Sequence, residues 1–131
     1  AATTLARQAE RLVRPLAVGG VAVLAGTQTA AITPFVFPGS SLHDELIALE
    51  AAGLTDLQAL QAATIAPARF FGRETEMGTV APGRFADLVV LDGNPARDIR
   101  RVRDLYAVIT HGKLIERAEL LALGNAEARA R

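Results

Sequence analysis

Residues 20–29 read Gly-Val-Ala-Val-Leu-Ala-Gly-Thr-Gln-Thr, an apolar run that ends in three polar side chains. Valine and leucine favour a buried strand, and Gly26 lets the backbone bend or approach another group closely. The run therefore predicts a buried β-strand over residues 21–25 that stops at a polar turn, where α/β proteins usually carry their chemistry. An ordinary core strand that runs into a polar loop is the alternative.

The sequence before this strand indicates a helix. Residues 3–17 place apolar side chains at helical spacing between charged ones, and Gly19-Gly20 would end the helix. Helix, glycine turn and buried strand make the second half of a βαβ unit. Such a strand needs parallel neighbours on both sides, and the sequence offers no obvious second one.

A loop follows over residues 29–40, in which Pro34 and Pro38 bracket the apolar residues 35–37. A long loop at a strand end is often functional, but three apolar residues between prolines are equally consistent with a plug over the core. Both interpretations stay open.

Three short helices are predicted after this loop. The first begins at Ser41, with Asp44 at the spacing of a capping box, and the second is capped by Thr55 and Gln58. Pro67 suits the first turn of the third helix, and glycines at positions 53 and 72 end the first and third. The side chains predicted to face the core are Leu42, Leu46, Ile47 and Leu49 in the first helix, and Leu57, Leu60 and Ala63 in the second.

The pattern then changes to that of strands. Residues 86–92 are rich in β-forming side chains, and residues 106–110 and 113–115 read as a hairpin that turns at His111-Gly112. The charges of residues 97–104 alternate in sign, which indicates a solvated face. A helix from Ala118 at least to Leu123 is predicted near the end.

Composition limits the classes of function. The 131 residues are 50% hydrophobic, carry a formal net charge of zero and include no cysteine. This length suits one domain with a substantial core, and the balanced charge predicts no nucleic-acid or membrane partner. No apolar run is long enough to span a bilayer, and disulfides and thiolate zinc ligands are excluded. Residues 1–10 lack the pattern of a signal peptide, and the absence of cysteine is compatible with the cytoplasmic location that we expect.

Four stretches of the sequence form a familiar series. They are Ala25-Gly26-Thr27, Leu42-His43-Asp44-Glu45-Leu46, Gly53-Leu54-Thr55, and Gly78-Thr79-Val80-Ala81-Pro82-Gly83-Arg84-Phe85-Ala86-Asp87-Leu88-Val89. In this order they resemble the C-terminal part of the amidohydrolase superfamily, closest to its imidazolonepropionase-like and prolidase-like branch. The resemblance covers about Leu5 to Leu121 and is most specific over residues 78–91 and 108–114.

That family combines a TIM barrel, with one or two divalent metals at the C-terminal ends of its strands, and a small β-sandwich built from both chain termini. The resemblance implies an α/β fold in which this chain is a C-terminal fragment of the TIM-barrel enzyme. It would supply the last helix–strand unit of the barrel, the helices after it and the C-terminal strands of the sandwich. The implied regions are residues 1–75 from the barrel, 76–116 from the sandwich, and 117–131 as a helix or tail.

Two departures from the family pattern bear on catalysis. The family's histidine ligands and carboxylated lysine would lie upstream, and the two histidines present, His43 and His111, lack ligand spacing. We therefore expect no metal in this chain alone and zinc in a complete member. Gln28 stands where the family carries the aspartate that binds metal and takes a proton from metal-bound water. A carboxamide has no basic lone pair for that proton, and losing a general base costs roughly 10²- to 10⁴-fold in rate.

The resemblance also implies substrate contacts. It places His43 near the mouth of the barrel, where it would contact substrate together with Thr29. A surface histidine at a helix start is the alternative for His43. Arg69 either clamps an anionic group or is a solvated charge at a helix end, and His111 in its turn is expected to be exposed.

Three hypotheses for function follow. The chain is the C-terminal part of a metal-dependent amidohydrolase that hydrolyses C–N bonds, and it is inactive alone. Alternatively, it is a non-catalytic chain that docks onto a partner supplying the rest of the barrel, because an unpaired buried strand demands pairing. The third hypothesis is a small α+β binding module that only shares ancestry with the family.

Overall fold

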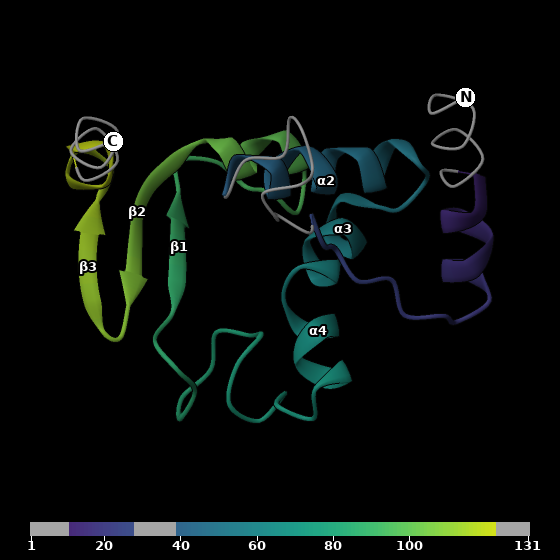
Figure 1. Ribbon diagram of the computed structural model, residues 1–131, viewed down its shortest axis with the longest axis horizontal. Coiled ribbons are helices and arrows are strands. Elements are labelled where there is room, and N and C mark those ends of the chain that lie inside the picture. Colours follow the sequence, from purple (N-terminus) through teal and green to yellow (C-terminus); the bar gives the residue numbers. More distant parts are fainter. Residues whose placement is uncertain (1–10, 28–38, 123–131) are drawn as a thin grey trace, which may run out of the picture.

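The computed structural model describes residues 11–27 and 39–122 of the chain. A small antiparallel sheet lies at one end of the molecule, and the helical residues 11–18 lie at the other (Figure 1). Three further helices occupy the space between them. The described chain is therefore a mixed helix and strand structure in which these three helices lie apart from the sheet. Residues 117–122, which directly follow its last strand, are helical, as predicted from Ala118 onward.

The helix predicted over residues 3–17 is confirmed for its described part, since residues 11–18 are helical. It ends as the glycines predict. Gly20 has a φ of 80° and donates its N–H to the carbonyl of Ala17, while the N–H of Val21 reaches the carbonyl of Leu16 at 3.0 Å. This pair of bonds is a Schellman motif, which a residue with positive φ makes possible.

The strand predicted over residues 21–25 is wrong for this structure, because these residues pair with no strand in the described part of the chain. Apart from the N–H of Val21, which belongs to the helix end, their backbone is held by the N–H of Ala25, which reaches the carbonyl of Ala62 at 2.9 Å. Val23 and Ala25 pack partly buried against the core, whereas Val21 is 52% exposed. A strand exists only where a neighbour completes its ladder, and apolar composition alone does not supply one.

Helix α2 spans Ser40–Ala51, and its N-cap is Gly39 with a φ of 83°. The predicted capping box at Ser41 is therefore wrong, because the helix begins one residue earlier and Ser41 is buried inside its first turn. The predicted end is confirmed. Gly53, with a φ of 105°, donates to Glu50, and the next N–H reaches back to Leu49 in a second Schellman motif.

Helix α3 spans Asp56–Ala62 and begins with the predicted capping box of Thr55 and Gln58. Its inward face matches the prediction in part, because Leu60 and Ala63 pack partly buried against the core. Ala59 and Ala62 are buried, whereas Leu57 is 49% exposed. Two residues subtend about 200° around a helix, so Leu57 lies on the side opposite Ala59.

Helix α4 spans Ile65–Phe70 and starts two residues before Pro67. Proline is tolerated there because the N–H groups of a first turn have no partner within the helix. Gly72, with a φ of 67°, ends the helix as predicted, and the N–H of Arg73 reaches the carbonyl of Ala68 at 2.8 Å.

The sheet has the order β1-β2-β3, with β1 at Leu88–Leu91, β2 at Leu105–Thr110 and β3 at Lys113–Glu116. Both pairings are antiparallel, and the register shifts between Val90 and Leu91. The predicted hairpin is confirmed. Its turn residues His111 and Gly112 have φ values of 49° and 75°, the positive values that two-residue hairpin turns require.

A 3₁₀ helix, η1 at Ile99–Arg103, lies between the strands β1 and β2. The solvated face predicted over residues 97–104 is wrong in part, because its arginines are exposed but Ile99 is fully buried and Val102 nearly so. These two side chains join the helical core, whose buried members are Leu46, Leu49, Leu54, Ala59, Ala62, Ile99 and Val102. Thus η1 packs the connection between the strands against α2 and α3.

Candidate functional site

The residues expected at the barrel mouth are described only in part. Gln28 and Thr29 lie outside the described residues, which stop at Thr27 before that loop. His43 lies in the first turn of α2 and is partly buried. The structure therefore neither assembles nor separates these three residues.

The described residues do not fit the divalent metal that the resemblance implies. Within residues 11–27 and 39–122, no three histidine, aspartate or glutamate side chains gather as a metal site requires. His43 belongs to α2 and His111 to the turn between β2 and β3. Carboxylates and imidazoles hold zinc as sets of three or four, so this part of the chain offers no donor set for it.

His111 is exposed, as predicted, and its backbone has a structural role. Its N–H donates to the Oδ1 of Asp87 at 2.9 Å, and its Nδ1 lies 3.1 Å from the Oγ1 of Thr110. Asp87 immediately precedes β1, so this bond ties the start of one strand to the hairpin turn that follows the next. The carboxylate of Asp87 thus links the start of β1 to the turn between β2 and β3.

Arg69 lies in the last turn of α4 and is exposed. A cation at this position interacts favourably with the partial negative charge of a helix C-terminus. Its surroundings support the solvated helix-end charge over the anion clamp.

Three contacts that sequence reasoning missed join the helices to η1. The Oδ1 of Asp56 accepts the N–H of Ile99 at 2.9 Å, across 43 positions of sequence. Arg103 pairs with Asp44, and the Nη2 of Arg100 lies 3.6 Å from the Oε2 of Glu50. The available signal was the group of arginines in residues 97–103, which can pair with acids on neighbouring elements.

Within η1, Arg101 is paired with Asp104 at 2.8 Å. The hydrogen bond and the charge of Asp104 raise the pKa of Arg101 above its ordinary value. Since arginine is protonated at any physiological pH, the shift records the pairing and does not indicate acid–base chemistry.

The loop before β1, which leads into the segment that resembles the family most specifically, is held together by polar groups of residues 73–84. The guanidinium of Arg84 donates to the carbonyls of Glu74 and Met77, at 3.1 Å for Met77. Arg73 forms an ion pair with Glu76 at 2.7 Å and lies 5.7 Å from the centre of the Phe85 ring. These side chains shape the loop before β1, so their contacts give them a structural role.

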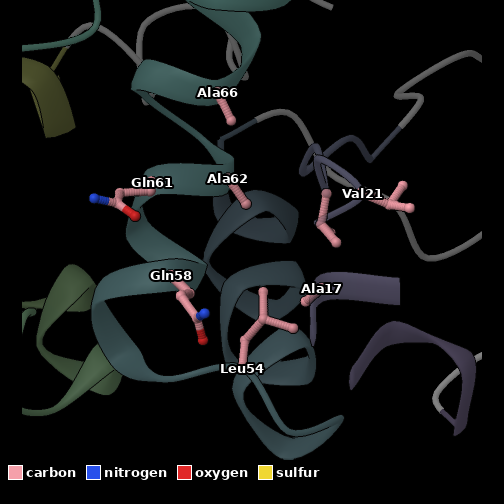
Figure 2. Close-up of a pocket in the computed structure, with 8 residues that line it drawn as sticks. Ala17, Val21, Leu54, Gln58, Gln61, Ala62 and Ala66 are labelled. Carbon is pink, nitrogen blue, oxygen red and sulfur yellow. The ribbon is translucent and has the colours of Figure 1, made fainter. Parts of the chain in front are cut away.

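A shallow concavity of about 140 Å³ lies between the N-terminal segment and the helices α3 and α4 (Figure 2). Small apolar side chains form most of its wall, and the amides of Gln58 and Gln61 are its polar groups. It contains no acid, base or nucleophile, so it offers a contact surface and no chemistry. Its lining residues are Ala17, Val21, Val23, Leu54, Gln58, Gln61, Ala62 and Ala66.

Large apolar side chains are exposed over much of the described chain. Phe70 and Phe71 are 69% and 72% exposed, with ring centres 5.1 Å apart. In the sheet, Val89 pairs with Val108 across β1 and β2, and Leu114 pairs with Ile109 across β2 and β3. Neighbouring residues of a strand point to opposite faces, so both faces of the sheet are apolar. Antiparallel sheets with one solvated face alternate apolar and polar residues, so this pattern suits a sheet covered on both sides.

No helix among the described residues combines the length and the apolar character needed to cross a membrane.

The family model described as "Amidohydrolase family" matches residues 4–115. Adenine deaminase 2 of Jannaschia sp. (strain CCS1) is 44% identical over 64 residues, which are 49% of this chain and 10% of that protein. Adenine deaminase 2 of Rhizobium meliloti (strain 1021) is 40% identical over 88 residues, 63% of this chain and 14% of that protein.

Among solved structures, a putative prolidase from Bifidobacterium longum is 33% identical, with a TM-score of 0.71. The match covers 87% of this chain and 29% of the prolidase. The chain thus spans between a tenth and a seventh of these curated relatives, and less than a third of this solved structure.

Proposed function

The chain belongs to the amidohydrolase family, with prolidase-like structural neighbours, and from this we propose that it is the C-terminal part of a metal-dependent hydrolase of C–N bonds. The observation that carries the proposal is the family match over residues 4–115, combined with a chain that spans only a small share of its relatives. Adenine deaminases and prolidases both break a bond between carbon and nitrogen, so these relatives share the class of bond that they hydrolyse. The substrate would be chosen by the rest of the protein.

We propose that residues 1–75 belong to the barrel, 76–116 to the sandwich and 117–131 to a terminal helix or tail. The described residues 21–25 support this assignment, because they are apolar yet have no strand partner among the described residues. The sheet supports it as well, because side chains on both of its faces are exposed and apolar. In the proposed arrangement, the remainder of the barrel and sandwich covers these surfaces.

In this proposal, Gln28 occupies the position of the proton-accepting aspartate, and His43 and Thr29 contact the substrate nearby. The divalent metal, zinc, would supply an activated water in the complete protein and would be held by residues outside the described chain. A carboxamide at position 28 offers only a carbonyl oxygen, so proton transfer from that water would lack its acceptor. The complete protein would therefore be a weak hydrolase or a non-catalytic one.

The first prediction tests position 28 in the complete protein, with the sequence upstream of this chain included. Gln28→Asp should raise hydrolysis by about 10²- to 10⁴-fold by restoring a general base. Gln28→Asn is the matched control, because asparagine has the shape of aspartate without its basicity. Release of ammonia from adenine and of proline from dipeptides would be measured for both variants. Equal rates for the two would contradict the role of position 28, and an upstream sequence without a His-x-His pair would contradict the barrel assignment.

A second candidate is a separate, non-catalytic chain that docks onto a partner carrying the other barrel strands. The exposed apolar side chains favour it, and they argue against the small binding module, which would need to cover its own core. Light scattering and binding of an apolar dye by the 131-residue chain would test this candidate. A monodisperse monomer that binds no dye would contradict it.

A further inference from the structure

We draw no further inference here: the strongest candidate, the open groove of about 390 Å³ between residues 77–87 and the β2–β3 turn, brings Arg84, Asp87 and His111 together, but Arg84 and Asp87 already bind backbone groups and nothing in the structure shows what covers or fills it.

Discussion

Asp56 shows how one side chain serves two parts of the molecule. It lies in the first turn of α3, where a negative charge suits the helix N-terminus, and its carboxylate also accepts the N–H of the fully buried Ile99. Asp98 accepts the next N–H of η1, from Arg100. Two acids from different elements therefore satisfy the start of this 3₁₀ helix.

Removing the carboxylate of Asp56 should be costly. Asp56→Ala leaves the N–H of Ile99 without its partner, so we expect a loss of about 1–3 kcal/mol in the free energy of unfolding, measured by urea titration. Asp56→Asn keeps an acceptor oxygen and should lose less. Asp44→Ala removes a carboxylate whose pair with Arg103 is exposed and should cost at most about 1 kcal/mol. A larger loss for Asp44→Ala than for Asp56→Ala would contradict this ranking.

Gly78 and Gly72 illustrate two reasons why a position requires glycine, a positive φ and a lack of space for a Cβ. Both have positive φ, 89° and 67°, but a Cβ on Gly78 would lie 2.8 Å from the Cβ of Ala68 and 3.0 Å from the Cα of Ile65, whereas one on Gly72 meets nothing within 4 Å. Gly72→Ala should therefore cost about 1–2 kcal/mol of left-handed strain alone. Gly78→Ala should cost a further 1–3 kcal/mol or so, because α4 must shift.

Urea titration of the two glycine variants measures this difference directly. Equal losses would show that the approach of residue 78 to α4 is looser than the structure indicates. The comparison also explains why the family-like segment begins at a glycine: the chain turns there against the backbone of α4.

At the scale of elements, the charge pattern of residues 97–104 did not reveal that η1 packs into the core. Its three arginines predict solvent, while its two apolar residues complete the core between α2 and α3. A five-residue 3₁₀ helix offers no long period to recognise, since each of its faces carries at most two side chains. The burial of Ile99 and Val102 depends on helices that lie more than 35 residues away in sequence, as the contact of Asp56 with Ile99 at a separation of 43 illustrates.

Ile99 and Leu57 provide the corresponding test of which apolar residues carry the fold. Ile99→Ala should lose about 2–5 kcal/mol of unfolding free energy, because the removed side chain is fully buried. Leu57→Ala should change stability by no more than about 0.5 kcal/mol, because Leu57 is 49% exposed on the outer side of α3. Thermal and urea unfolding of both variants would check this order. The reverse order would support the inward position that the sequence predicted for Leu57.

The elements that sequence reasoning predicted correctly depend on local chemistry. The capping box at Thr55, the glycines that end three helices and the His111-Gly112 turn each follow from residues within a few positions of one another. The errors at residues 21–25 and at Leu57 concern partners from distant sequence, which no local pattern contains. The candidate site was the least predictable part, since the residues expected there depend on a family resemblance and two of them lie outside the described chain.

At the scale of the whole molecule, the net charge and the exposed apolar surface both favour association. The chain has a formal net charge of zero, so little electrostatic repulsion opposes self-association. Exposed apolar residues occur on the helical residues 11–18, on α4 and on the sheet, so they are not confined to one face. This distribution differs from the single patch typical of a binding site, and it is the one expected if the proposed remainder of the protein covers several elements.

Substitutions on the two faces of the sheet test whether the rest of the proposed protein covers it. Val89 and Leu114 are 62% and 51% exposed and lie on opposite faces of the sheet. In the 131-residue chain, Val89→Thr and Leu114→Thr should each change the unfolding free energy by no more than about 0.5 kcal/mol, because both side chains already contact water. If the proposed sandwich is correct, the same substitutions in the complete protein should each cost about 1–3 kcal/mol of unfolding free energy, because covered side chains lose their burial. Equal effects in the two contexts would mean that the rest of the protein leaves the sheet open, and the proposed sandwich would then be wrong.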